Sequence, residues 1–163
     1  MKNVITGIFL LLSVCFMQAQ TPNYYRSPEK IYLDSKDGHN GGFNWQMYKA
    51  GEAKDPAEKI SQPGYQTGDW MPAIVPGTVL NSLVHNKVYP EPYYGMNNKL
   101  DQNIIPDLAK AGRDFYTYWF RTEFDVPESY KDKIVWLQVD GINYRAEIWV
   151  NGYLLSNMSG MFK

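Results

Sequence analysis

The sequence predicts an all-β fold, an antiparallel β-sandwich of the jelly-roll type. Several short segments alternate apolar and polar residues, helical patterns are few, and the connecting loops are long and rich in aromatic residues. A jelly roll needs about eight strands to close its two sheets. The sequence offers four or five, so we expect a sandwich that is incomplete at its C-terminal end, with an unpaired sheet edge and low stability in isolation.

Period-2 alternation predicts the first strand in residues 43–48, with Phe43, Trp45 and Met47 on one face. Residues 51–68 mix charges, prolines and glycines without a period, so they predict a loop. An extended segment is predicted for residues 70–75.

A helix is predicted after the turn at Pro76 and Gly77. Thr78 is a good N-cap residue, and the apolar residues that follow it share one helix face: Val79, Leu80, Leu83 and Val84. Residues 100–112 predict one further helical turn, with Pro106 in its first turn and Gly112 at its end.

The longest alternation predicts a strand over residues 116–126. Its more apolar face carries Tyr116, Tyr118, Phe120, Thr122, Phe124 and Val126. The apolar run 134–139 predicts a buried strand, and residues 144–150 alternate again. Asn151 and Gly152 then predict a type I′ hairpin turn, because both central residues of that turn need positive φ, and residues 153–157 predict the return strand.

Residues 1–20 have the pattern of a secretory signal peptide. Lys2 precedes an apolar run, and cleavage is expected near Ala19 or Gln20. The run is shorter than the ~20 residues of a membrane span. Lipoprotein cleavage at Cys15 is the alternative that we favour less. Residues 21–40 form a polar leader, so the sandwich is expected over residues 41–163 of a secreted or periplasmic protein.

The formal net charge is −1, and it becomes −2 when Lys2 is removed with the signal peptide. The sequence has no basic run and no basic amphipathic helix, which disfavours nucleic acid and anionic membranes as partners. Cys15 is the only cysteine, so the mature chain is expected to fold without disulfides. No motif indicates a cofactor.

No catalytic residue and no metal site are predicted. The two histidines, His39 and His85, lie far apart and have no cysteine partners in the mature chain. The acidic residues fall in loops or on solvent faces of predicted strands: Glu91, Asp101, Asp107, Asp114, Glu123, Asp125 and Glu147. Trp70 and Trp149 are assigned to core packing in preference to ligand stacking.

Four fragments occur in one order: residues 70–79 (WMPAIVPGTV), 92–97 (PYYGMN), 118–121 (YWFR) and 140–152 (DGINYRAEIWVNG), the last followed by residues 160–162 (GMF). Together they resemble the N-terminal sugar-binding, galactose-binding-like sandwich of family 2 glycoside hydrolases over roughly residues 43–163. Residues 88–97 are more similar to β-mannosidases and exo-β-glucosaminidases than to β-galactosidases or β-glucuronidases.

The resemblance implies a retaining enzyme that hydrolyses terminal β-linked sugars without a cofactor. In such enzymes an immunoglobulin-like domain and a (β/α)₈ barrel follow the sandwich, and the barrel carries the two catalytic glutamates. A barrel takes about 250 residues, so both domains are expected to lie outside this chain, which alone is not expected to be active. A stand-alone carbohydrate-binding module and a structural sandwich between domains are the alternatives.

The resemblance also implies that the loop between the helix and the long strand approaches the sugar pocket of the barrel. Asn97 matches an asparagine of that loop, and an amide both donates to and accepts from sugar hydroxyls. Tyr93 and Tyr94 are expected to shape the rim. The predicted substrate-binding residues are therefore Asn97, Tyr94 and Tyr93, and the predicted partners are carbohydrate and the barrel.

Overall fold

The structure is a computed structural model that describes residues 30–36, 42–102 and 104–160. The expected signal peptide, Cys15, His39 and most of the leader lie outside these residues. The residues from Tyr32 onwards belong to one unit, Tyr32–Lys163.

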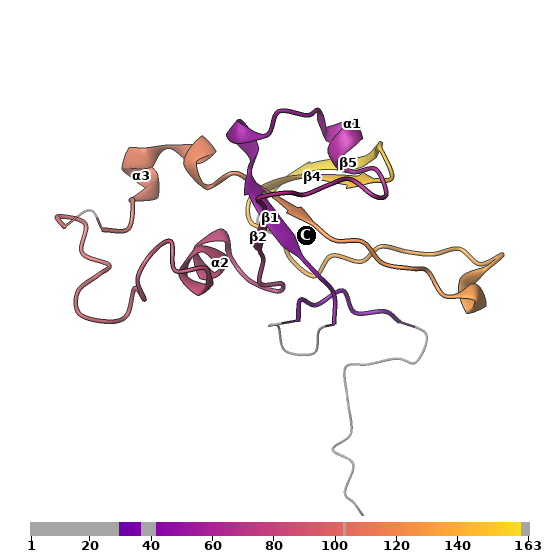
Figure 1. The fold of residues 1–163 in the computed structure, drawn as a ribbon, viewed down its shortest axis with the longest axis horizontal. Helices are drawn as coiled ribbons and strands as arrows, with labels where there is room; N and C mark the ends of the chain where they lie inside the picture. The colour runs from indigo at the N-terminus through magenta and orange to yellow at the C-terminus, as the bar shows by residue number, and fades with distance from the viewer. Residues whose placement is uncertain (1–29, 37–41, 103, 161–163) are drawn as a thin grey trace, which may run out of the picture. The chain divides into compact units, whose positions relative to one another are not determined.

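Two antiparallel sheets and several short helices make up the described part of this unit (Figure 1). The strands are β1 (Gln46–Lys49), β2 (Met71–Pro72), β3 (Tyr118–Arg121), β4 (Arg145–Val150) and β5 (Tyr153–Ser159). The α-helices are α1 (Ala57–Ile60), α2 (Val79–His85) and α3 (Leu108–Ala111), and the 3-10 helices are η1 (Ala50–Glu52), η2 (Arg113–Tyr116) and η3 (Glu128–Tyr130).

Strand β1 is the centre of the first sheet, whose order is β2-β1-β3 with antiparallel neighbours on both sides. Met47 lies opposite Met71 of β2 and opposite Phe120 of β3. The predicted alternation is confirmed here, because Met47 is completely buried while its neighbours in β1 are half-buried.

The hydrophobic core lies between this sheet and α2. Met47, Ala73 and Leu83 are its buried members. Partly buried residues packed against them are Trp45, Met71, Val79, Tyr89, Tyr116, Tyr118 and Phe120. The first half of the predicted 116–126 face therefore does cover the core, as its alternation requires.

Helix α2 begins as the sequence predicts. The Thr78 hydroxyl accepts a hydrogen bond from the Asn81 amide at 3.0 Å, which satisfies one of the free N–H groups of the first turn. Ser82 in this helix is fully buried, and its hydroxyl accepts from the Ile74 amide at 3.0 Å. The buried hydroxyl of Ser35 accepts from Val75 at 3.0 Å, so the segment before β1 is fixed beside the segment that enters α2.

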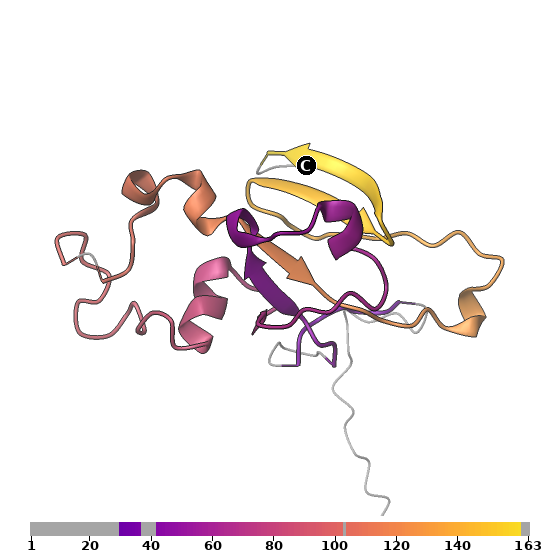
Figure 2. The same cartoon turned by 45° about the horizontal axis from the view of Figure 1, so that its top comes forward.

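The second sheet is the hairpin of β4 and β5. Asn151 (φ 51°) and Gly152 (φ 87°) both have positive φ, which confirms the predicted turn. The hairpin lies beside α1 (Figure 2), where the Gly152 amide donates to the Ser61 hydroxyl at 3.1 Å. The positive φ of Gly152 favours glycine, and a Cβ atom there would also stand 3.2 Å from the Glu58 carbonyl and would displace the end of the Gln62 side chain.

The predicted loop over residues 51–68 is wrong in part, because it contains η1 and α1. Pro56, in extended conformation, precedes the first turn of α1. Lys59 forms an ion pair with Asp55 at 2.7 Å across one turn. Two local stabilising features thus start a helix that is too short to show a hydrophobic period.

The predicted strand over residues 116–126 starts late and ends early, because Tyr116 belongs to η2 and β3 is Tyr118–Arg121. Strand β1 supplies partners only for Tyr118–Arg121, so the residues after Arg121 have no partner strand among those described. Pro106 also differs from expectation: it precedes the N-cap residue Asp107 of α3 and does not occupy the first turn. Gly112 ends α3 with φ 84°, as expected of a helix C-terminus.

The predicted strand over residues 134–139 is not formed. These residues have no regular secondary structure, and within the described chain none of their backbone groups pairs with another strand. A β-strand is defined by hydrogen bonds to a neighbouring strand, so a segment with a strand-like sequence does not form one when no neighbouring strand is present.

Candidate functional site

The predicted substrate-binding residues lie in one loop, residues 88–98, directly after α2. The loop is closed by turns: the Tyr94 amide donates to the Glu91 carbonyl at 3.2 Å, and the Asn97 amide donates to the Tyr94 carbonyl at 3.1 Å. Gly95 (φ 57°) and Met96 (φ 71°) reverse the chain between them. A backbone hydrogen bond across this turn therefore holds Asn97 close to Tyr94.

The two tyrosines of this loop project into solvent. Tyr93 is 93% exposed and Tyr94 is 77% exposed, far more than rings that serve packing. Asn97 is half-buried, and its side-chain nitrogen donates to the Glu91 carbonyl at 2.9 Å. The loop thus presents two aromatic rings beside an amide that also braces it.

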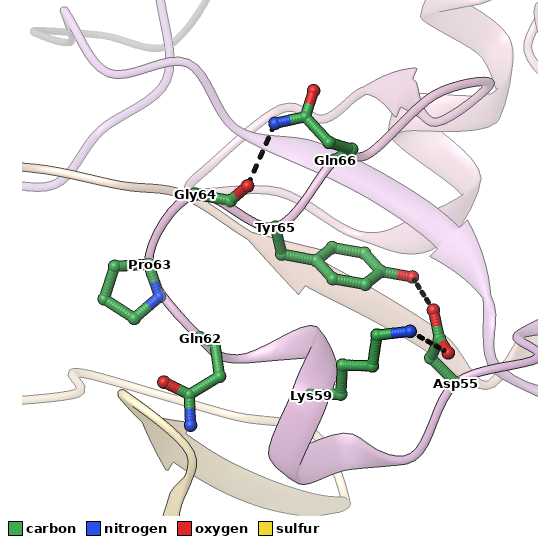
Figure 3. A pocket seen from close by; sticks show the side chains of 7 residues that line it. All are labelled: Asp55, Lys59, Gln62, Pro63, Gly64, Tyr65 and Gln66. Carbon is green, nitrogen blue, oxygen red and sulfur yellow. Dashed lines mark hydrogen bonds and ion pairs between the residues drawn. The ribbon is translucent and has the colours of Figure 1, made fainter.

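A shallow cleft of about 420 Å³ lies beside α1 (Figure 3). None of the residues that line it belongs to the loop of residues 88–98. Asp55 is its only acidic lining residue, and Tyr65 forms one wall. The Tyr65 hydroxyl donates to Asp55 at 3.1 Å, and Lys59 pairs with the other carboxylate oxygen. The hydrogen bond from Lys59 lowers the pKa of Asp55, while burial raises the pKa of Tyr65.

A second cleft of about 210 Å³ adjoins it and contains Arg121 and Glu123. Arg121 donates to the carbonyl of Ile60, the last residue of α1, at 2.9 Å and to that of Gln62 at 2.8 Å, and it also pairs with Glu123. The hydrogen bond from Arg121 lowers the pKa of Glu123, and so does the one from the Gly64 amide. This guanidinium fixes the end of α1 to β3.

Neither cleft has the donor set of a hydrolytic site. Each is lined by a single carboxylate, and that carboxylate is already paired with a cation. In the part of the chain that the structure describes, no group of three His, Cys, Asp or Glu residues could hold a metal ion. The same residues include no helix that is long and apolar enough to cross a membrane.

Trp70 packs, as predicted. Its ring stacks on Tyr48 at 5.5 Å between centroids, with 12° between the ring planes, and it meets Tyr65 edge-on at 6.1 Å. Trp149 is half-buried and donates from its indole nitrogen to Glu147 at 3.1 Å. Trp70 is therefore engaged with other rings of the domain, whereas the packing role of Trp149 stays a prediction.

Sequence reasoning missed the polar network around α1. The four-residue spacing of Asp55 and Lys59 was a usable signal, because that spacing suits an ion pair on a helix. The contact of Arg121 with Ile60 had no signal, since the two residues are 61 positions apart in the chain. The role of Asn97 as a brace of its own loop was missed because its partner is a backbone carbonyl, which no side-chain pattern reveals.

Comparison with known proteins identifies residues 45–163 as a domain described as glycosyl hydrolase 2 galactose-binding domain-like. A mannosylglycoprotein endo-β-mannosidase of Lilium longiflorum is 40% identical over 101 residues, which are 62% of this chain and 10% of the relative. No solved structure matches significantly.

Two exo-β-D-glucosaminidases are also similar. That of Streptomyces avermitilis is 32% identical over 66% of this chain and 11% of its own length, and that of Amycolatopsis orientalis is 30% identical over 57% and 8%. The matched part is thus about a tenth of each relative. The domain match spans most of the chain and agrees with its antiparallel sheets. The chain therefore belongs to glycoside hydrolase family 2 and carries the galactose-binding-like β-sandwich domain of that family.

Proposed function

We propose that this chain is the N-terminal part of an exported, retaining β-glycosidase that hydrolyses terminal β-linked sugars. The observation that carries the proposal is the family match over residues 45–163, together with relatives whose names denote β-mannosidase and β-D-glucosaminidase activity. The sandwich would brace an immunoglobulin-like domain and a catalytic barrel elsewhere in the same polypeptide. It needs no cofactor for that role.

The loop of residues 88–98 would form part of the sugar pocket. Its exposed rings, Tyr93 and Tyr94, suit the apolar faces of sugars, and the Asn97 amide oxygen would act as an acceptor, because it is the amide nitrogen that binds Glu91. The brace from Asn97 to Glu91 would hold the loop in shape before a sugar arrives, which lowers the entropy cost of binding.

The catalytic carboxylates would come from the barrel. Retaining hydrolysis needs two carboxyl groups about 5 Å apart. The clefts beside α1 contain one paired carboxylate each, which supports the proposal that this chain alone has no hydrolytic activity.

The first experiment compares the longest polypeptide encoded in frame with this chain and the 163-residue chain itself. Both are assayed on an aryl β-mannoside, an aryl β-glucosaminide and a mannosylglycopeptide, the last because the lily relative is named as an endo-acting enzyme. We expect turnover of one terminal β-glycoside by the longer polypeptide only, with retained anomeric configuration by NMR. Inverted products, or no turnover of any of the three substrates, would contradict the proposal.

Export is tested separately by the intact mass of the protein recovered from the periplasm or medium. We propose removal of residues 1–20, with cleavage near Ala19 or Gln20. A mass that retains Lys2 would contradict export through a cleaved signal, and a lipid-modified Cys15 would show the lipoprotein route.

A stand-alone carbohydrate-binding module is the second candidate, and the exposed pair Tyr93 and Tyr94 is the observation that favours it. Calorimetric titration of the 163-residue chain with methyl β-mannoside and methyl β-glucosaminide separates the two. Measurable affinity that is lost in a double Tyr93→Ala, Tyr94→Ala variant would support the module.

A further inference from the structure

Residues 122–143 form an extended arm between β3 and β4. The chain leaves β3, turns at the short helix η3 and returns to β4 in both views (Figures 1 and 2). Six large apolar residues of this arm are substantially exposed: Phe124, Val126, Ile134, Val135, Trp136 and Leu137. Phe124 has an edge-on contact with Phe43 at 6.0 Å.

The return limb of the arm is the anomalous part. Ile134 is 85% exposed and Trp136 is 86% exposed, and the intervening Val135 is 54% exposed. The run 134–139 contains no charged residue, no proline and no glycine. Surface loops are normally polar, and a contiguous exposed apolar run in a soluble domain marks an interaction site.

The backbone of this limb is equally unusual. Among the described residues, no backbone hydrogen bond involves residues 134–143, although the limb is extended and carries a strand sequence. Unpaired N–H and C=O groups along an extended segment are a template for adding another strand. Backbone and side chains therefore indicate the same kind of partner.

We propose that Ile134–Val139 is a strand-docking site whose occupant is an extended, alternately apolar segment of the same longer polypeptide, from outside the described residues. This inference rests on one part of the proposed function, namely that the chain belongs to a longer protein. The length of the relatives, about ten times that of the matched part, supports this part of the proposal. It assigns the docking contact to the arm.

The pattern of the limb distinguishes this occupant from a second copy of the chain. In a strand, Ile134 and Trp136 would lie on one face and Val135 and Leu137 on the other, so both faces are apolar. A strand that is apolar on both faces belongs inside a fold. Two copies paired edge to edge would leave these faces in water, whereas the remainder of a longer polypeptide can supply both a partner strand and the further side chains that cover the faces, at a high effective concentration.

Hydrogen exchange measured by mass spectrometry tests the site directly. We expect the amides of residues 134–139 to exchange about tenfold or more slowly in the longest in-frame polypeptide than in the dilute 163-residue chain. Fast exchange in both proteins would overturn the inference, as would a reading frame that ends at Lys163. Protection in the 163-residue chain that rises with concentration, as dimers form, would identify a second copy as the occupant and would also overturn it.

Matched variants separate docking from general destabilisation. Trp136→Glu and Leu108→Glu each replace an exposed apolar residue by a carboxylate, the first in the arm and the second in α3, where Leu108 is 55% exposed. In the longer polypeptide we expect only Trp136→Glu to abolish the protection of residues 134–139. Equal protection in both variants would contradict the site.

Glycosidase activity, measured on the same samples, distinguishes this inference from the proposed function. If the arm is protected in an inactive polypeptide, the docking site is supported and the enzymatic function is contradicted. If the polypeptide is active and its arm is unprotected, the enzymatic function is supported and the docking site is contradicted.

Discussion

The side chains of the loop after α2 differ in how far the fold already engages them. Asn97 binds the Glu91 carbonyl through its amide nitrogen, so only part of its hydrogen-bonding capacity remains for a ligand. Tyr93 and Tyr94 have no comparable structural duty, because their rings are almost entirely in water. Asn97 thus helps to hold the shape of the loop, and the contact of the tyrosines with a ligand is the part that we propose.

Asn97→Ala in the longer enzyme is expected to raise KM about three- to tenfold and to change kcat little, because one neutral hydrogen bond contributes about 0.5 to 1.5 kcal/mol. Steady-state kinetics on the preferred aryl β-glycoside measure this change. Asn98→Ala, at the exposed neighbouring position, is the control and should leave KM unchanged. A wild-type KM in Asn97→Ala would remove Asn97 from the sugar pocket.

Glu123 predicts an acid dependence of stability. Its pKa is lower in the folded chain than its ordinary value of 4.5, chiefly through Arg121. A lowered pKa means that the ionised form stabilises the fold above the ordinary value, and that this contribution disappears as the pH falls through the lowered pKa.

Urea denaturation of the longer polypeptide, as the wild type and as Glu123→Gln, should therefore show a stability gap at neutral pH that closes as the pH falls below 4.5 and through the lowered pKa. Glu128→Gln is the control, because Glu128 pairs only with the exposed Lys131. A gap that does not depend on pH would show that the charge of Glu123 is not what stabilises the fold.

Secondary-structure elements here divide into those that form locally and those that need a distant partner. The β4–β5 turn and α2 belong to the first kind, since Asn151-Gly152 and Thr78 specify them through their own backbone and side-chain chemistry. Helix α1 belongs to the second kind. Its end is held by Arg121 of β3 and contacts the hairpin at Gly152.

Arg121→Lys is expected to destabilise the fold by about 1.5 to 3 kcal/mol, because the ammonium group cannot reach the carbonyls of Ile60 and Gln62 in the same fork geometry. The Arg121 side chain is only 11% exposed, so water does not replace these bonds readily. Chemical denaturation of the longer polypeptide, which is expected to unfold cooperatively, measures the loss. Arg113→Lys, at an exposed position, should change stability little, and an equal loss in both variants would argue against the Arg121 bridge.

Local patterns predicted the elements that depend on local chemistry, and they failed where pairing decides. The strand predicted over residues 116–126 forms only at Tyr118–Arg121, the four residues that pair with β1. The run 134–139 has a strand sequence and yet stays unpaired, because no partner is present among the described residues. In the candidate site, the exposure of Tyr93 and Tyr94 could not be read from sequence, since exposure depends on what packs around a loop.

The molecule as a whole keeps a small core beside a large exposed apolar surface. Among the described residues only Met47, Ile60, Ala73, Ile74 and Leu83 are buried hydrophobics. Meanwhile β5 exposes Tyr153, Leu154, Leu155 and Met158. A core of this size stabilises a domain only weakly, and the incomplete sandwich stays a prediction.

The 163-residue chain is therefore expected to unfold without a sharp thermal transition, to bind the dye ANS while native, and to self-associate at raised concentration. Calorimetry, dye fluorescence and light scattering measure these properties. The longer polypeptide is the control and should melt cooperatively without binding the dye. A cooperative melt of the monomeric 163-residue chain would contradict the expectation of an incomplete sandwich.

The hydrogen bonds of Arg121 also determine the order in which parts of the domain can fold during synthesis. Its guanidinium holds carbonyls that were synthesised 61 and 59 residues earlier, and β1 has its second neighbour only when β3 exists. As the ribosome extends the chain, the segment around α1 must wait for its anchor, because contacts so far apart in sequence form late. A chain arrested before Arg121 is therefore expected to be cleaved readily by proteases around Ile60. The peptide bonds there should become resistant to cleavage soon after β3 emerges.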